Sequence, residues 1–336
     1  MARLGIAVVG CGEWGRNHVR AFVGLPGARL LHVADASPER REVARGIAPD
    51  AVVSDDLAAA LADPAVGAVV VATPSPTHAA LGRAALAAGK HVLIEKPLAP
   101  TAAEADDLVA RATAAGRILM VGHLLLHHPA VRHLKSLLAR GGLGDLHYLY
   151  AQRTNLGRIR TDENALSSLG PHDVSVMAYL LDAWPESVSA QGAAYVQPTR
   201  EDVVFVTMRF PGGRLGHMHL SWLDPHKVRR LTLVGSRRMA VFDDMEPADK
   251  IRVHDKGPVP AEPGTWGEAL ALRFGETRIP RLPNVEPLRA ELRAFVKSCV
   301  TGTQPLTDGA SGASVVRVLA AAEKSLRKGG RDVTVE

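Results

Sequence analysis

The chain has 336 residues, of which 46% are hydrophobic and 22% are charged, and its formal net charge is +5. This length and composition predict a soluble globular protein of two domains with a sizeable core, and they exclude disordered and fibrous classes. No apolar stretch reaches 18 residues, so we expect no transmembrane helix and no membrane partner.

Cysteine content and charge indicate the expected cellular compartment and the expected class of ligand. Cys11 and Cys299 are too few for a disulfide framework, so we expect a reducing, cytoplasmic environment. The chain opens directly on a predicted strand, which predicts no signal peptide. Aromatic residues make up only 4% and no basic run occurs, so nucleic acid is not an expected partner. The positive charge instead suits small anionic ligands such as dinucleotides or sugar nucleotides.

The first 35 residues predict a strand, a glycine turn, a helix and a second strand. An apolar run at 4–9 leads into Gly10-Cys-Gly-Glu-Trp-Gly15, a helix is expected at 15–24, and the strand at 30–35 ends in Asp35. A G-x-G-x-x-G motif in this position, with an acid 20 residues after its last glycine, is typical of dinucleotide binding.

Each position of the turn has a physical role in that interpretation. Gly10 permits the tight turn, Gly12 lets the backbone approach a pyrophosphate, and Gly15 lets the helix pack on the strand. The helix N-terminus offers free N–H groups to the phosphates. Asp35 can accept hydrogen bonds from ribose hydroxyls, which favours NAD over NADP. An ordinary tight turn is the alternative.

Strand and helix continue to alternate up to residue 122. The run at 66–72 is nearly all apolar, as in a parallel strand that is buried on both faces. The later elements are expected at 77–88 (helix), 91–95 (strand), 101–115 (helix, opened by a Thr101–Glu104 capping box) and 118–121 (strand). This alternation predicts a doubly wound parallel sheet of Rossmann type over residues 1–122.

After Gly122, strands follow one another without intervening helices. Strands are expected near 146–153, 187–196, 202–210, 214–222, 229–235 and 239–243, and helices at 129–140, 170–181, 287–300 and 309–328. Residues 255–285 are rich in Pro and Gly and are expected to form a long loop. We therefore predict a second, α+β domain over 123–336 with an open, mostly antiparallel sheet; its C-terminal helices can pack back on the first domain.

Two segments follow strands of the first domain at the end where ligands bind in open α/β sheets. Glu95-Lys96-Pro97 closes the strand at 91–95, and a lysine there can stabilise a developing alkoxide, or can be a simple surface charge. The segment Thr73-Pro74-Ser75-Pro76-Thr77-His78 follows the strand at 66–72. It either covers a cofactor or is a proline-rich connection in which His78 caps the next helix.

In the second domain, His172-Asp173 follows Gly170-Pro171 at the predicted start of a helix. A histidine there can take a hydroxyl proton near neutral pH, or it can be structural. The helix dipole suffices to explain Asp173 in a first turn.

A polar loop and a histidine group complete the candidates. Asn155, Arg158, Arg160 and Asn164 either hold phosphate or sugar hydroxyls or form a solvated loop. His123 and His127 have the i, i+4 spacing of metal ligands, and His128 follows them. Because Gly and Pro bracket this segment and no acid lies close by, we expect no metal.

Together, these motifs resemble the Gfo/Idh/MocA family of NAD(P)-dependent sugar and cyclitol oxidoreductases. The segments that carry the resemblance are Gly10–Gly15, Asp35, Ala72–His78, Glu95–Pro97, Gly170–Asp173, Pro287–Leu292, Pro305–Asp308 and Ala320–Leu326. The resemblance implies NAD as cofactor, Lys96 in the active site and His172 as acid/base. It also implies a homodimer or homotetramer that packs through the open sheet face. The implied cofactor contacts are Gly10, Gly12, Glu13, Trp14, Gly15, Asp35, Thr73, Pro74, His78, Glu95, Lys96 and Pro97.

The sequence departs from the family at Ser168, where many members carry an aspartate four residues before the histidine. This departure counts against a plain inositol dehydrogenase. The segments 155–160, 163–173 and 221–227 resemble the branch that acts on nucleotide-linked sugars, which includes UDP-N-acetylglucosamine(uronate) 3-dehydrogenases. Such enzymes oxidise the C-3 hydroxyl so that a PLP aminotransferase can install an amine. The implied substrate contacts are Asn155, Arg160, Asn164, His172, Asp173 and Lys227.

Several alternatives stay open from the sequence. They are an NAD(P)H-dependent 3-ketosugar reductase, an aminoglycoside or cyclitol dehydrogenase of secondary metabolism, and a hydrolase that uses bound NAD transiently. A non-catalytic regulator that senses a dinucleotide is a further alternative, although such a regulator needs neither Lys96 nor His172.

Overall fold

The computed structural model describes residues 3–157, 159–161, 163–260 and 270–336. The chain divides into two compact units. Unit 1 comprises Met1–His128 and Val285–Arg317, and unit 2 comprises Pro129–Asn284 and Val318–Glu336. Among the described residues, no helix combines the length and the apolar character needed to cross a membrane.

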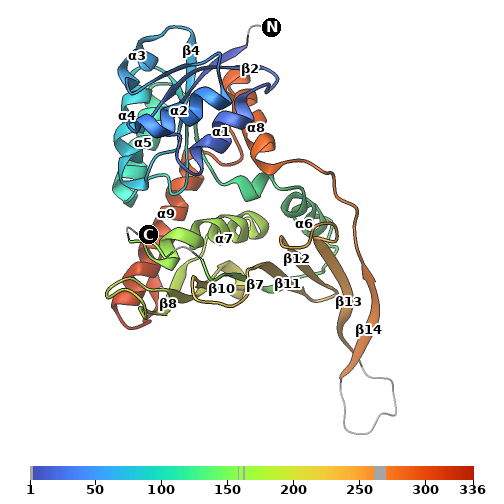
Figure 1. Ribbon diagram of the computed structural model, residues 1–336. Helices are drawn as coiled ribbons and strands as arrows, with labels where there is room; N and C mark the ends of the chain where they lie inside the picture. The colour runs from blue at the N-terminus through green and yellow to red at the C-terminus, as the bar shows by residue number, and fades with distance from the viewer. Residues whose placement is uncertain (1–2, 158, 162, 261–269) are drawn as a thin grey trace. The chain divides into compact units, whose positions relative to one another are not determined.

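Unit 1 is built on a six-stranded parallel sheet in the order β3-β2-β1-β4-β5-β6. Two of its strands, β2 and β4, are labelled in Figure 1. Its strands are β1 (Leu4–Val9), β2 (Ala28–Ala34), β3 (Val52–Ser54), β4 (Val66–Val71), β5 (His91–Ile94) and β6 (Leu119–Val121). The strand order reverses between β1 and β4, and in open α/β sheets ligands bind outside the carboxyl ends of the strands at such a point. The predicted doubly wound sheet is confirmed.

Helices cover both faces of this sheet because its strands are apolar on both faces. Alternate residues of β1 enter two separate cores, with Ile6 and Val8 in one and Ala7 and Val9 in the other. The first core also contains residues of α1, α2 and α8, and the second contains residues of α3, α4, α5 and the start of α9. The helical segments of this unit are α1 (Gly15–Phe22), α2 (Pro38–Ile47), α3 (Leu57–Ala62), η1 (Ser75–Thr77), α4 (His78–Ala87), α5 (Ala102–Ala114), η2 (Leu124–His127), α8 (Pro287–Thr301) and the first part of α9 (Gly309–Arg327).

Helices α2 and α3 were not predicted from the sequence. Each begins at a side-chain cap, because Ser37 accepts from the Arg40 N–H and Asp56 accepts from the Ala59 N–H. Only one residue of each helix, Ala44 and Ala60 respectively, is fully buried. The apolar periodicity that identifies longer helices is therefore weak in both.

Unit 2 contains a nine-stranded sheet in the order β14-β13-β12-β11-β7-β10-β9-β8-β15. All neighbours are antiparallel except β7 and β10, so the predicted open, mostly antiparallel sheet is confirmed. The strands are β7 (Leu146–Thr154), β8 (Ser187–Ala193), β9 (Val203–Arg209), β10 (Leu215–Ser221), β11 (Val228–Gly235), β12 (Met239–Asp243), β13 (Ile251–Pro260), β14 (Leu270–Arg278) and β15 (Val333–Thr334). The unit also holds α6 (Pro129–Ala139), α7 (Ala165–Leu181) and η3 (Pro211–Gly213).

Helix α7 packs on one face of this sheet, and the other face is open. On β7, Leu149 and Ala151 are buried, whereas Tyr148 and Tyr150 are 44% and 41% exposed. This alternation is that of an antiparallel sheet with one covered face.

Two sequence predictions in unit 2 are wrong. A long loop was expected over 255–285, but residues 255–260 belong to β13 and 270–278 to β14, and these two strands pair as an arm that extends from the sheet (Figure 1). Residues 261–269 lie outside the described residues. Pro258 is tolerated in β13 because β12 pairs with this strand only as far as His254. Helix α7 begins at Ala165 instead of 170, since Asn164 and Ser167 form a capping box, and Pro171 lies inside the helix.

Candidate active site

The turn between β1 and α1 has the shape that a pyrophosphate requires. Gly10 has φ +91°, and a Cβ there would lie 2.6 Å from the Ala72 carbonyl oxygen. A Cβ on Gly15 would lie 2.1 Å from the Gly10 carbonyl oxygen. Both positions therefore exclude a side chain, and the N-terminus of α1 opens directly behind them. The turn fits a dinucleotide on this geometry.

Asp35 at the end of β2 is aimed at the same turn. Its carboxylate is buried, accepting from the Cys11 N–H at 2.6 Å and from the Ser37 N–H at 2.9 Å. The two oxygens retain lone pairs that can accept ribose hydroxyls. Burial, followed by Asp35, raises the pKa of the Cys11 thiol, which supports an inert role for this cysteine.

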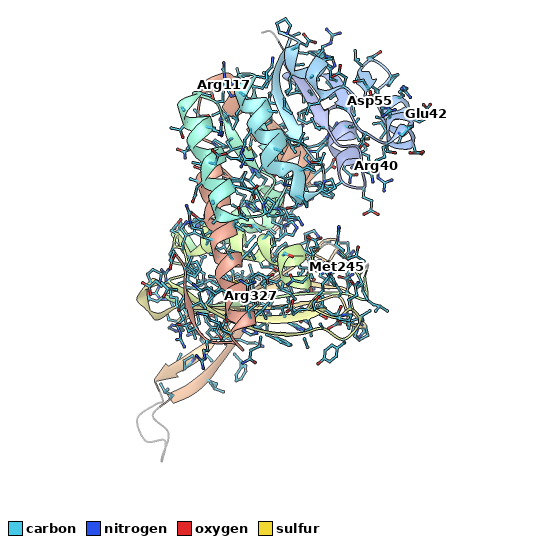
Figure 2. All side chains as sticks on the ribbon, turned by 90° about the vertical axis from the view of Figure 1, so that its left-hand side faces the viewer. Arg40, Glu42, Asp55, Arg117, Met245 and Arg327 are labelled. Carbon is cyan, nitrogen blue, oxygen red and sulfur yellow. The ribbon has the colours of Figure 1, made fainter. Side chains whose placement is uncertain are left out.

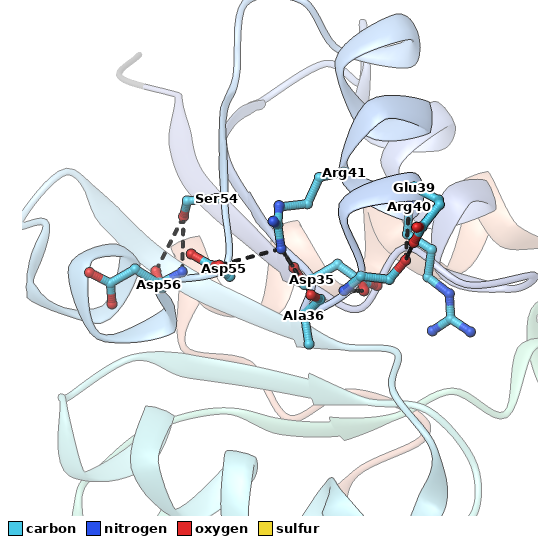
Figure 3. Close-up of polar contacts among 9 residues, drawn as sticks. Asp35, Ala36, Glu39, Arg40, Arg41, Ser54, Asp55 and Asp56 are labelled. Carbon is cyan, nitrogen blue, oxygen red and sulfur yellow. Dashed lines mark hydrogen bonds and ion pairs between the residues drawn. The ribbon is translucent and has the colours of Figure 1, made fainter.

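Two arginines flank Asp35, and sequence reasoning missed both. Arg41 is held by the main chain, donating to the carbonyls of Asp35 at 2.8 Å and Ala36 at 3.0 Å, and it pairs with Asp55 (Figure 3). Arg40 is exposed on the surface of unit 1 (Figure 2), and its guanidinium lies 3.6 Å from the position of a Cβ on Gly12. Of these two arginines, Arg40 is therefore the one whose charge is available to a ligand on the glycine turn.

Glu95, directly after β5, contacts both the segment of the glycine turn and the main chain of Lys96. Its Oε1 accepts from Trp14 Nε1 at 2.5 Å and contacts His18 Nε2 at 2.6 Å, and its Oε2 accepts from the Lys96 N–H at 3.2 Å. Burial raises the pKa of Glu95, but the His18 and Trp14 hydrogen bonds and the Lys96 charge outweigh it and hold that pKa below its ordinary value. The carboxylate therefore acts as an internal anchor that sets the position of half-buried Lys96.

His78 joins the two predicted strand-end segments. The side chain is buried, its Nδ1 lies 2.7 Å from the Pro97 carbonyl oxygen, and its Nε2 lies 2.9 Å from the Thr73 carbonyl oxygen. His78 therefore neither caps a helix nor is solvated. It holds the 73–78 loop against the turn that carries Lys96. The glycine turn, Asp35, both strand-end segments and their candidate cofactor residues all follow carboxyl ends of parallel strands in unit 1.

In unit 2, His172 and Asp173 lie in the middle of α7, not at its start, so the helix-dipole explanation of Asp173 is wrong. The Asp173 carboxylate forms a two-pronged ion pair with Arg153 of β7, at 2.8 Å from Nε and 2.7 Å from Nη2. His172 is half-buried, and Ser168 precedes it by one turn of the helix. The ion pair fixes the turn of α7 that carries His172 onto the sheet. Sequence reasoning missed Arg153, since only the strand register places it opposite α7.

The other predicted substrate contacts differ in how far their side chains are already engaged. Asn164 caps α7 and donates to Glu201 at 2.8 Å and Glu323 at 2.9 Å, so its amide serves the fold. Arg160 pairs with Glu163 at 2.9 Å. Lys227 is exposed.

The last two candidates from the polar loop have different outcomes. Asn155 accepts a hydrogen bond from Arg229 at 3.3 Å, an arginine that sequence reasoning did not single out. Arg158 lies outside the described residues.

The histidines after β6 do not lie on one helical face. His123 precedes the short 3-10 segment η2, so it does not share a helical face with His127. Burial lowers the pKa of His123 to about 4. Within the described ranges, no three His, Cys, Asp or Glu residues are grouped to hold a metal ion.

Comparison with known proteins agrees with both units. Residues 4–123 match the oxidoreductase family with an NAD-binding Rossmann fold, and residues 131–241 match the GFO/IDH/MocA C-terminal domain. The UDP-N-acetylglucosamine 3-dehydrogenase of Acidithiobacillus ferrooxidans is 31% identical over 96% of each chain. An inositol 2-dehydrogenase of Mycolicibacterium smegmatis is 31% identical over 100% of this chain and 97% of its own.

A solved relative connects the fold to the cofactor. The structure of GenD2 from gentamicin A biosynthesis, in complex with NAD, superposes with a TM-score of 0.83 at 26% identity and covers 100% of this chain and 97% of its own. The glycine turn and Asp35 lie within the residues of unit 1 that match the NAD-binding family. The chain therefore belongs to the Gfo/Idh/MocA family and is an NAD-binding oxidoreductase of the class that acts on CH–OH groups.

Proposed function

We propose that this protein oxidises the C-3 hydroxyl of a nucleotide-linked or amino sugar to a ketone with NAD. The observation that carries the proposal is the similarity to the A. ferrooxidans UDP-N-acetylglucosamine 3-dehydrogenase, which extends over 96% of both chains. Ser168 supports the same choice, because it replaces the second carboxylate expected of a plain inositol dehydrogenase.

The proposed chemistry divides between two side chains. NAD, held by the glycine turn and Asp35, supplies the hydride acceptor. His172 takes the hydroxyl proton as general base. Lys96, placed by Glu95, donates a hydrogen bond to the same oxygen and stabilises the charge that develops on it. Asp173 and Arg153 hold the helical turn on which His172 is carried.

Oxidation of a cyclitol or an aminoglycoside is the competing proposal. The M. smegmatis inositol 2-dehydrogenase matches all of this chain at 31% identity, and GenD2 shares its fold across the whole chain. Both would retain the roles of Lys96 and His172 and change only the substrate.

We place the enzyme in the cytoplasm, upstream of a PLP aminotransferase that consumes a 3-ketosugar. We also propose a homodimer or homotetramer that packs through the open face of the unit 2 sheet. On that face Tyr148 and Tyr150 stack, and Phe205 is 43% exposed and stacks on His219. Burying exposed aromatic surface of this kind favours association.

Reduced-nicotinamide absorbance tests the function. Enzyme and NAD are mixed with UDP-N-acetylglucosamine, its uronate, UDP-glucose, myo-inositol, scyllo-inositol or an aminoglycoside, with and without 2-oxoglutarate to reoxidise bound NADH. We expect a signal with a UDP-sugar, reduced about 100-fold or more in Lys96→Met and in His172→Ala. His147→Ala, at an exposed position of β7, is the matched control. A signal with inositol or aminoglycoside alone overturns the substrate, and full activity in either variant overturns its catalytic role.

A further inference from the structure

Two arginines of unit 2 face each other across neighbouring strands. Arg153 of β7 and Arg229 of β11 are register partners in an antiparallel pair. Directly opposed residues of such a pair share a face, here the face of buried Leu149 and Leu231 that α7 covers. Like charges in this position destabilise a sheet unless counter-charges compensate them.

Among the described residues, Arg153 has a carboxylate partner and Arg229 has none within ion-pair distance. Arg153 is neutralised by the two-pronged ion pair with Asp173. Arg229 donates instead to the main-chain oxygens of Thr154 at 3.0 Å and Val228 at 2.9 Å, and to the amide oxygen of Asn155 at 3.3 Å. In the part of the chain that the structure describes, no carboxylate lies within ion-pair distance of Arg229.

The surroundings leave Arg229 as an excess positive charge. Asp244 is close, since its N–H donates to the Arg229 carbonyl at 2.8 Å, but its carboxylate already contacts Lys250. Burial and Arg153 lower the pKa of Arg229 to about 10, against the opposing effects of Asp173 and Asp244. The guanidinium is therefore still charged at neutral pH although it is half-buried. Keeping a half-buried positive charge next to Arg153 destabilises the fold. A charge in this position indicates a ligand-binding role more readily than a structural one.

Asn155 completes the arrangement. Its Oδ1 is used by Arg229, so its Nδ2 donor, which has no acceptor among the described side and main chains, stands next to the guanidinium. The N–H groups of an arginine and an adjacent amide are suited to an oxyanion with two oxygens on one centre. Asp173 follows His172 directly on α7 and binds Arg153, and Arg153 is the register partner of Arg229. Arg229 and Asn155 are therefore connected through Arg153 and Asp173 to the proposed base.

We infer that Arg229 and Asn155 bind an anionic group of the sugar substrate, either a carboxylate or a phosphoryl group. The inference rests on the proposed function and sharpens it. An enzyme with this corner selects negatively charged sugars and discriminates against neutral cyclitols, because a neutral ligand leaves the Arg229 charge uncompensated.

Calorimetric titration of the NAD-loaded full chain tests this inference with UDP-glucuronate, UDP-glucose and myo-inositol as probes. We expect Arg229→Met and Asn155→Asp to weaken anion binding by about 10- to 100-fold, with any binding of myo-inositol unchanged. The Asp side chain would capture Arg229 and repel the anion without removing the arginine. A loss confined to UDP-glucuronate identifies the carboxylate, and an equal loss with UDP-glucose identifies the phosphoryl group.

Arg230→Met is the matched control. Arg230 is adjacent in β11 but points to the other face and pairs with Asp243 at 2.8 Å, so wild-type affinities are expected. The inference is overturned if the wild type binds neither nucleotide sugar, if Asn155→Asp binds both as the wild type does, or if all three probes weaken equally. Turnover is measured separately: anion binding that depends on Arg229, without oxidation of any sugar, refutes the proposed function but not the anion site.

Discussion

Glu95 and His18 lie 77 residues apart in the sequence, and their side chains meet at 2.6 Å in the interior of unit 1. His18 belongs to the helix that follows the glycine turn, and Glu95 immediately precedes Lys96. Trp14, within the glycine turn itself, donates to the same carboxylate oxygen. One buried carboxylate therefore couples the position of the cofactor turn to the position of the proposed catalytic lysine.

Replacing Glu95 by Gln should weaken this coupling. We expect a loss of about 1–3 kcal/mol of stability at pH 7, because the amide keeps the shape but not the charge-assisted hydrogen bonds. The folded-state pKa of Glu95 is depressed, so its stabilisation is present above the ordinary glutamate pKa of about 4.3 and is lost as pH falls through the folded value.

Thermal unfolding midpoints of both proteins, measured from pH 7 down to pH 3, check this prediction. The wild type should lose its advantage over Glu95→Gln as the solution becomes acidic. Glu42→Gln, at an exposed position of α2, is the control and should stay within about 0.5 kcal/mol of the wild type. An advantage that persists unchanged to pH 3 would contradict the role of the ionised carboxylate.

Glu291 on α8 predicts the opposite pH dependence. Its carboxyl is fully buried, and neither oxygen has a hydrogen-bond partner among the residues described. Burial, and then the charge of Glu95, raise its pKa well above the ordinary value. The folded state must keep this proton while the unfolded state releases it, so stability falls as pH rises above about 4.3 towards the folded pKa.

Glu291→Gln removes that proton requirement. The variant should match the wild type near pH 4 and unfold at a higher temperature than the wild type at pH 8. Glu286→Gln, at the exposed start of the same helix, should show no such divergence. Calorimetric unfolding at the two pH values measures the difference, and a variant that is less stable than the wild type at pH 8 would refute the prediction.

Local motifs and parallel topology made the arrangement of the candidate cofactor segments predictable. The glycine turn, Asp35 and Glu95-Lys96-Pro97 are each specified within a few residues of a strand end, and a parallel sheet brings those ends to one edge. The side-chain contacts between segments that are distant in the sequence were not predictable. The contacts of Glu95 with His18 and of Arg153 with Asp173 depend on packing or strand register between distant segments, which no local pattern encodes.

Glycine and proline residues caused the main errors in the predicted secondary structure. Gly170-Pro171 was interpreted as a helix start, but the capping box at Asn164 begins α7 earlier and the helix continues through the proline. Pro and Gly between 255 and 285 were interpreted as a loop. In β13 they lie beyond the part that pairs with β12, so a proline there removes no hydrogen bond of the sheet ladder on that side.

His78 should matter for cofactor binding without touching the chemistry. In His78→Ala the carbonyls of half-buried Thr73 and Pro97 lose their hydrogen-bond partner, at a cost of about 1–3 kcal/mol each, and the two loops are released from each other. We expect a raised Kd for NAD, measured by titration, and a partial recovery in His78→Gln. His147→Ala serves as the control. Wild-type NAD affinity in His78→Ala would show that the loops hold their positions without this side chain.

Asp35 and Arg40 together should set the choice between NAD and NADP. The buried Asp35 carboxylate repels a 2′-phosphate, so the wild type should prefer NAD. In Asp35→Ser that repulsion is gone, and the guanidinium of Arg40, which has no acceptor among the described residues and lies 3.6 Å from the position of a Cβ on Gly12, can bind the phosphate. We expect the ratio of kcat/KM for NADP over NAD to rise by about 100-fold.

Adding Arg40→Gln should abolish the gain, whereas adding Arg45→Gln, at the far end of α2 and paired with Glu42, should keep it. If Asp35→Ser/Arg40→Gln uses NADP as well as Asp35→Ser does, the phosphate is bound by other groups and Arg40 has no part in cofactor choice.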